Sequence, residues 1–126
     1  MKRLWLGVGV LLGLLAVSLW AMEYAQQTHQ SISDILEEAA LAVQEENWTK
    51  ARALQQQAVE QWEKSWSITA ALSDHTELDE IDAGFARLEA YCRDGHVTDF
   101  AAESGALARQ VEALGEGHRL SLSNLL

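Results

Sequence analysis

Residues 4–22, LWLGVGVLLGLLAVSLWAM, decide how the rest of this chain is organised. The stretch carries no charged residue, follows Lys2 and Arg3 directly, and stops at Glu23, the first acidic residue of the chain. As a helix, its 19 residues would span about 28 Å, which suits a bilayer core roughly 30 Å thick. We therefore expect residues 1–22 to be a single transmembrane anchor.

Charged and aromatic residues at the ends of this stretch predict its orientation. Trp5 and Trp20 lie near the two ends, where indole rings favour the headgroup region. Lys2 and Arg3 both precede the stretch, so the positive-inside rule predicts a cytoplasmic N-terminus and a single-pass protein of the cell membrane. Residues 23–126 would then form one extracytoplasmic domain.

The same stretch has two further interpretations. Ala16 and Ser18 form a small-x-small pair of the kind that precedes a signal-peptidase site, so cleavage is the alternative to an anchor. No helix breaker precedes that site, which favours an uncleaved signal anchor. Gly9 and Gly13 have the G-x-x-x-G spacing that lets two membrane helices approach closely, although glycine is common in membrane helices generally.

Composition limits what the outer domain can bind. Residues 23–126 hold all 19 acidic residues and seven of the nine basic ones, a net charge of −12, so neither nucleic acid nor an anionic lipid surface is an expected partner. About 100 residues suffice for one small domain. Cys92 is the only cysteine, which excludes an intramolecular disulfide; we expect a buried thiol, with an intermolecular disulfide or a reactive thiol as the alternative.

The rest of the chain has helical periodicity. There is no proline, and apolar residues recur at spacings of three and four in four segments. The stripe residues include His29, Ile32, Leu36, Ala39 and Val43; Ala51, Leu54, Ala58, Trp62 and Trp66; Leu78, Ile81, Phe85, Leu88 and Cys92; and Phe100, Leu107, Val111 and Leu114. Because isolated stripes are not stable, we expect an all-α fold in which the transmembrane helix continues into an up-and-down antiparallel bundle.

Polar residues and glycines indicate where these helices end. The expected N-caps are Asn47 before Trp48, Thr76 supported by Asp79, and Thr98 or Asp99. Gly115 and Gly117 are expected to fray or kink the last helix, which would leave residues 120–126 as a short apolar segment.

Several residues together resemble a known family. They are Asn47–Trp48, Leu54, Trp62, Asp74–His75, Glu77, Ile81, Leu88, Tyr91 and the terminal Asn124–Leu125–Leu126. This pattern resembles the bacterial domain-of-unknown-function family four three six three, whose members are short one-pass membrane proteins of Gram-positive bacteria. The resemblance covers almost the whole chain and implies architecture and location, with no catalytic residues to carry over.

Histidines are the remaining candidates for chemistry, because imidazole titrates near neutrality and binds transition metals. If antiparallel helices are joined by turns near residues 47, 75 and 96, His118 lies at the same height along the bundle as His75. His29 then lies several turns away, and His96 lies at the far tip. We therefore expect no metal site and no cofactor. The alternative is a metal site formed by His75 and His118, with Asp74 or Glu77 as a further ligand. The structural alternative is that His75 lies at a helix C-terminus, favoured there by the dipole.

Other candidate residues have structural explanations. Trp62 and Trp66, one turn apart, are expected in the core, with an aromatic ligand shelf as the alternative. Acidic groups such as Asp79, Glu80 and Asp82 are expected to face water. No hydrolase, zinc-protease, nucleotide-binding or redox motif is recognisable, so no catalytic residue is predicted and an enzyme is not expected.

Two classes of function remain. The first is a membrane-anchored extracytoplasmic interaction or structural module, with the bilayer bound through residues 4–22 and either an envelope protein or a second copy as partner. Residues proposed for an interaction or structural role are Trp62, Trp66, Asp74, His75, Glu77 and Asn124, with Gly9 and Gly13 for dimerisation in the membrane. The alternative is a sensor-like bundle that binds a small ligand or metal ion.

Overall fold

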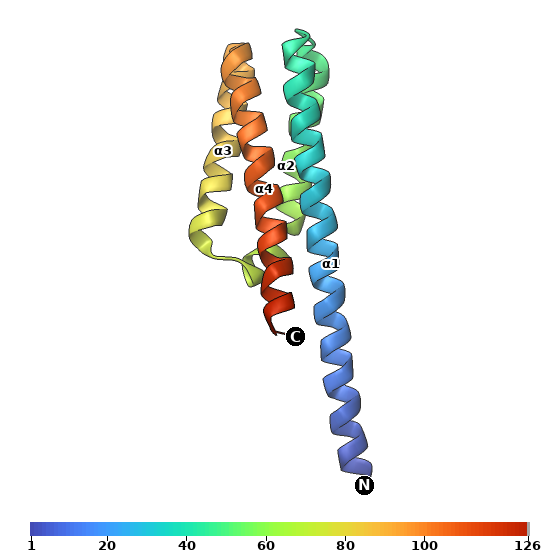
Figure 1. Ribbon diagram of the computed structural model, residues 1–126. Coiled ribbons are helices and arrows are strands. Elements are labelled where there is room, and N and C mark those ends of the chain that lie inside the picture. Colours follow the sequence, from blue (N-terminus) through green and yellow to red (C-terminus); the bar gives the residue numbers. More distant parts are fainter. Residues whose placement is uncertain (126) are drawn as a thin grey trace.

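Four helices form an up-and-down bundle in which the first is much longer than the others (Figure 1). The computed structural model describes the backbone of residues 1–125 and the side chains of residues 1–117 except Leu72. The helices are α1 (Lys2–Gln44), α2 (Trp48–Leu72), α3 (His75–Asp94) and α4 (Val97–Leu125). No strand occurs among residues 1–125. The predicted all-α antiparallel bundle is confirmed.

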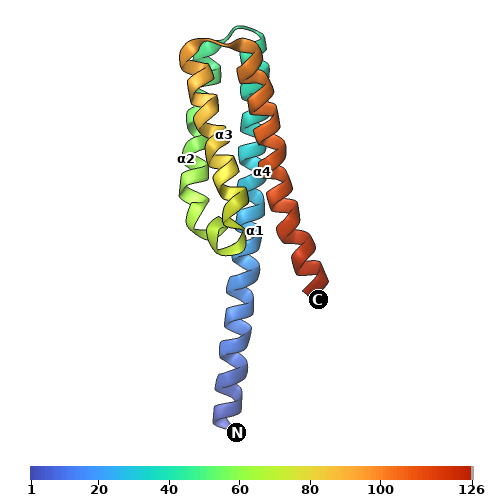
Figure 2. The same cartoon turned by 90° about the vertical axis from the view of Figure 1, so that its left-hand side faces the viewer.

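Helix α1 has two halves with different surroundings. Its 43 residues span about 64 Å without a break. Every residue from Met1 to Trp20 is exposed, and this apolar half projects beyond the bundle in both views (Figures 1 and 2). It is the one helix among the described residues that is long and apolar enough to cross a membrane. The second half is buried along one stripe from Ala25 to Val43.

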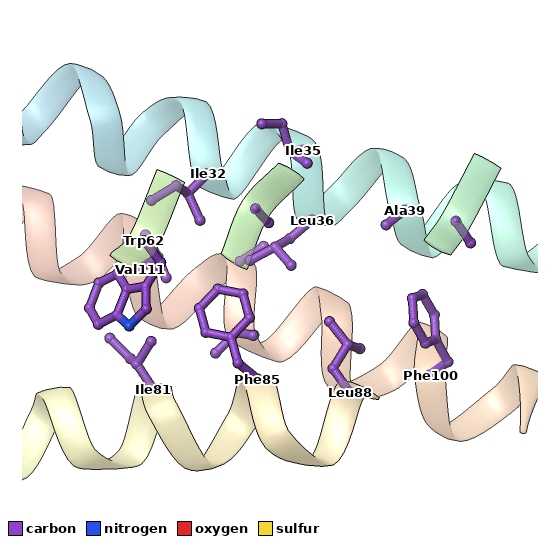
Figure 3. Packing of buried hydrophobic residues seen from close by; sticks show 14 of the residues in the cluster. Ile32, Ile35, Leu36, Ala39, Trp62, Ile81, Phe85, Leu88, Phe100 and Val111 are labelled. Carbon is purple, nitrogen blue, oxygen red and sulfur yellow. The ribbon is translucent and has the colours of Figure 1, made fainter. Parts of the chain in front are cut away.

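The bundle core lies between the stripes that the sequence predicts. Buried alanines from the first two helices belong to this core: Ala39 and Ala42 from α1, and Ala51 and Ala58 from α2. Larger side chains fill the centre and the side near α3 and α4 (Figure 3). The ring centroids of Trp62 and Phe85 lie 6.1 Å apart. Phe100 packs edge-on against Trp48, with 5.5 Å between their ring centroids.

Polar contacts tie α4 to its neighbours. The hydroxyl of Ser104, which is fully buried, donates to the backbone carbonyl of Leu36 at 2.6 Å, so this polar group adds a link between α4 and α1. On the surface, Arg87 of α3 donates twice to Glu103 of α4, and these hydrogen bonds with the accompanying charge raise the pKa of the guanidinium.

Two of the turns use left-handed backbone. Gly95 ends α3 at φ 71°, at the turn that the sequence predicts near residue 96. The turn after α1 places Glu46 at φ 60°, and the next N–H, that of Asn47, donates back to the carbonyl of Ala42 at 2.9 Å. Asn47 then caps α2 as predicted, because its side chain accepts from the N–H of Lys50 at 3.2 Å.

Two of the predicted caps are wrong. The side chain of Asp74, not Thr76, caps α3 by accepting from the N–H of Thr76 at 3.3 Å. Helix α4 begins at Val97, so Thr98 and Asp99 lie inside its first turn. In both places the first helical residue comes one or two positions before the residue that the sequence pattern favours as the N-cap.

The expected fraying of the last helix at Gly115 and Gly117 is also wrong. Helix α4 runs unbroken through Gly115 and Gly117 to Leu125. A Cβ atom on Gly115 would lie 3.4 Å from the Cβ of His29, so this glycine lets α4 pass close to α1. The side chains of residues 120–126, expected to form a short apolar segment, lie outside the described residues.

Candidate functional site

The turn between α2 and α3 holds three of the predicted site residues, and local helix chemistry explains two of them. Asp74 is the N-cap of α3, and Glu77 is the acidic residue of its first turn, where the helix dipole favours negative charge. His75 is the first residue of α3 and is exposed. The expectation that it lies at a helix C-terminus is therefore wrong.

The two tryptophans have different environments. Trp62 is buried, with 2% of its surface exposed, as predicted. Its indole Nε1 donates to Oδ1 of Asp82 on α3 at 2.7 Å, which gives this exposed carboxylate a role that the sequence pattern did not reveal. Trp66 is 39% exposed, so the expectation that it belongs to the core is wrong. One turn of helix is enough to move the second indole to the edge of the bundle.

A buried polar layer lies in the half of the bundle nearest the apolar helix. It consists of His29 and Ser33 from α1 and Ser65 and Thr69 from α2, each at most 1% exposed. The Oγ1 of Thr69 donates to the carbonyl of Ser65 at 2.9 Å, and Nε2 of His29 lies 3.2 Å from the same Oγ1. Because that hydroxyl has a single proton, His29 must donate through Nε2, and Nδ1 is then the acceptor of the neutral ring.

Contacts on both sides fix the position of His29. Its ring centroid lies 6.3 Å from that of Trp62, and the backbone of α4 passes it at Gly115. A polar layer of this kind has a defined set of partners, so it favours one register of α1 against α2 over slipped alternatives.

The histidines do not gather into one site among the described side chains. His75 is exposed at the turn between α2 and α3, and His96 lies at the opposite end, where its Nδ1 is 3.6 Å from Oδ2 of Asp99. The side chain of His118, like that of Asn124, lies outside the described residues. Because α4 meets His29 at Gly115, the expectation that His29 lies several turns from the level of residue 118 is wrong. Within the described residues no three potential ligands come together as a metal site.

A groove lies between α2 and α3, the neighbouring pair of helices with the sparsest contacts. Its volume is about 660 Å³. Its lining residues are mostly polar or charged: Arg52, Gln55, Gln56, Val59 and Glu60 from α2, and Glu89, Cys92 and Arg93 from α3. Neither Trp62 nor Trp66 lines it, so it is not the aromatic shelf considered from the sequence.

Two members of this lining are buried at its floor. Cys92 is 6% exposed, which confirms the expected burial of the thiol. Gln55 is also 6% exposed, and its side chain has no hydrogen-bond partner among the described residues. Sequence reasoning missed Gln55; the one available signal was a glutamine on the same helical face as Ala51, Ala58 and Trp62.

Comparison with known proteins gives the family. No curated protein and no solved structure matches the chain. A family model described as Domain of unknown function (DUF4363) matches residues 19–125, which include the end of the apolar stretch and all of the bundle. The chain therefore belongs to the DUF4363 family, as its tryptophan, histidine and C-terminal asparagine pattern indicated.

Proposed function

We propose that this protein is a membrane-anchored, extracytoplasmic structural or interaction module. The observation that carries the proposal is α1: one helix is fully exposed and apolar to Trp20 and then supplies a buried face of the bundle from Ala25. An exposed apolar surface of that length is stable in a bilayer and costly in water. The bundle would therefore be held at a fixed distance and angle from the membrane, because no loop separates the two halves.

Charge supports the proposed orientation. Lys2 and Arg3 precede the apolar half, and residues 23–126 carry 19 acidic against seven basic residues. The positive-inside rule then puts the short N-terminus in the cytoplasm and the acidic bundle outside. The turn between α2 and α3 would face the membrane, and the turns at Glu46 and Gly95 would form the distal end.

The surface of the bundle limits how a partner would bind. Beyond residue 24, the large apolar residues exposed among the described side chains are Leu41 and Trp66. A protein partner would therefore meet a mainly polar surface, with Leu41 as the apolar contact nearest the distal end. A Cβ atom built on Gly9 or Gly13 would meet no other part of the protein within 4 Å, so this face of the apolar half is open to a second membrane helix.

Topology and processing test the proposal directly. A reporter enzyme fused after Leu126 should be active outside the cytoplasm and inactive inside it. Mass spectrometry of the purified protein should detect the original N-terminus. A mature chain that begins at Leu19 would replace the anchor with a cleaved signal peptide, and cytoplasmic reporter activity would overturn the orientation.

Photo-crosslinking tests the interaction role. A photoreactive amino acid at position 41 should give a discrete adduct in intact cells, either with one envelope protein or with a second copy. The matched control is position 63, where Glu63 is exposed on α2. Equal, diffuse labelling from both positions would contradict a specific partner at the distal end of α1.

One observation favours the alternative function. The groove between α2 and α3 is large enough for a small molecule, and the amide of the mostly buried Gln55 opens onto it without a hydrogen-bond partner among the described residues. Small-molecule binding in the bundle is therefore the second candidate.

A further inference from the structure

The charges of the groove between α2 and α3 are ordered along its length. The hydrogen bond from Trp62 to Asp82 fixes the register of the two antiparallel helices. Arg52, ten residues before Trp62, is therefore level with Arg93, eleven residues after Asp82. Glu60 lies two turns from Arg52 toward the membrane-side end, a separation of about 12 Å along α2.

The arginines are not neutralised by carboxylates across the groove. Among the described residues Arg52 has no ion pair, and the only one of Arg93 is a 3.9 Å contact with its neighbour Asp94. Glu60 and Glu89, which also line the groove, likewise have no ion pair among those residues. In a chain with 19 acidic residues, two arginines at one level without a carboxylate between them leave room for an anionic group of a ligand.

Gln55 provides an independent indication of a ligand. Its side chain is more than nine-tenths buried, lines the groove one turn from Arg52, and has no hydrogen-bond partner in the described part of the chain. The amide atoms of Gln55 are open to the groove, so a bound molecule with a carbonyl and an N–H would pair with both of them. The amide of a peptide bond has both groups.

We propose that this groove binds a short zwitterionic peptide of two or three residues. Its C-terminal carboxylate would be held by Arg52 and Arg93, its backbone amide by Gln55, and its N-terminal ammonium by Glu60. Three extended residues span about 10 Å, which matches the separation of the opposite charges along α2. The inference does not depend on the topology or the protein partner proposed above, because it concerns the isolated chain.

Binding of trialanine to the full chain in detergent micelles tests the inference. Calorimetry should give a Kd of about 1 mM or tighter. Acetylation of the ammonium and amidation of the carboxylate should each weaken binding roughly tenfold, because each removes one charged contact. Absence of binding at about 10 mM, or equal binding of the doubly blocked peptide, would overturn the proposal.

Variants of the lining locate the site. Arg52→Gln combined with Arg93→Gln should weaken trialanine binding at least about tenfold, and Arg109→Gln, an exposed arginine of α4, should leave it unchanged. Glu60→Gln should weaken trialanine binding but not the binding of its N-acetylated form. If trialanine binds and none of these variants affects its affinity, the peptide site lies elsewhere and the proposal fails.

Cys92 supplies a second readout that does not require a variant. It is the only cysteine and lies at the floor of the groove, so alkylation by a small thiol reagent reports on this place alone. Saturating trialanine should slow the alkylation of Cys92 several-fold, and the doubly blocked peptide should not. An unchanged rate with bound trialanine would place the peptide outside the groove.

Discussion

Single side chains connect the helices of this bundle in ways that spacing alone does not show. Trp62 lies on the predicted apolar stripe, yet it also donates a hydrogen bond to Asp82, which the sequence pattern assigns to the solvent. Trp66 has the same residue type and lies one turn away, yet it is exposed. Periodicity predicts which side of a helix faces inward, but the edge of the buried sector depends on the neighbouring helices, which the sequence does not place.

Truncation of the two tryptophans should separate their roles. Trp62→Ala should lower the free energy of unfolding by about 3–5 kcal/mol, because it removes a large buried aromatic side chain. Trp66→Ala should cost less than about 1 kcal/mol, since its indole is partly solvated already. Urea denaturation of the full chain in detergent, followed by circular dichroism, measures both. Similar losses for the two variants would contradict the assigned environments.

The backbone at Glu46 predicts a stabilising substitution. A residue with a Cβ at φ 60° is strained by about 1 kcal/mol, and glycine relieves this strain. Glu46→Gly should therefore raise the free energy of unfolding by several tenths to about 1 kcal/mol. The control is Glu45→Gly, where φ is −87° and glycine gains nothing; this variant should be neutral or less stable than the parent chain. A loss of stability in Glu46→Gly would show that the left-handed turn does not form.

At the scale of the elements, the four helices could be predicted from sequence because stripes such as Leu78, Ile81, Phe85 and Leu88 keep one period throughout. Their starting residues were harder to predict, since Asp74, Thr76 and Asp79 are all good capping residues within two turns. The continuity of α4 was missed because glycine lowers helix propensity, whereas at Gly115 the close approach to His29 favours the small residue.

The cap of α3 is tested by two alanine substitutions. Asp74→Ala should lower the free energy of unfolding by about 1 kcal/mol, because it removes the acceptor for the N–H of Thr76. Thr76→Ala should change it by less than about 0.5 kcal/mol, since Thr76 is exposed in the first turn and its side chain is not the cap. The same denaturation experiment compares them. The reverse order would restore Thr76 as the cap.

The packing of α3 against α4 is tested by a matched pair of glycines. A Cβ on Gly84 would lie 2.8 Å from Cδ1 of the buried Leu107, whereas a Cβ on Gly105 would meet nothing within 4 Å. Gly105→Ala should therefore raise the free energy of unfolding by up to about 1 kcal/mol, because alanine has a higher helix propensity than glycine. At Gly84 the same gain should be opposed by an overpacking cost of about 1–3 kcal/mol, so the free energy of unfolding of Gly84→Ala should be at least about 1 kcal/mol below that of Gly105→Ala. Equal effects would show that α3 and α4 do not approach this closely.

At the scale of the whole molecule, the sequence predicted the bundle and the long first helix, but not the groove. The groove exists because α2 and α3 make few contacts with each other while both pack on their other neighbours. That imbalance depends on how four helices share one core, and no single stripe contains this information. The register between Trp62 and Asp82, which brings Arg52 level with Arg93, likewise appears only when the helices are assembled.

The central claim is that one unbroken helix joins the apolar half of the chain to the bundle. Spin labels at positions 12 and 30 test it, in a Cys92→Ser background and in lipid nanodiscs. Leu12 and Gln30 are exposed and lie 18 residues apart, which is five helical turns, so both labels would project from the same side of α1.

Pulsed electron paramagnetic resonance should give one narrow distance distribution centred at about 27 Å, the rise of 18 helical residues. A broad distribution, or one centred well below this value, would mean that α1 bends or melts between its two halves. The bundle would then be a flexibly tethered domain, and the proposed fixed position above the membrane would be wrong.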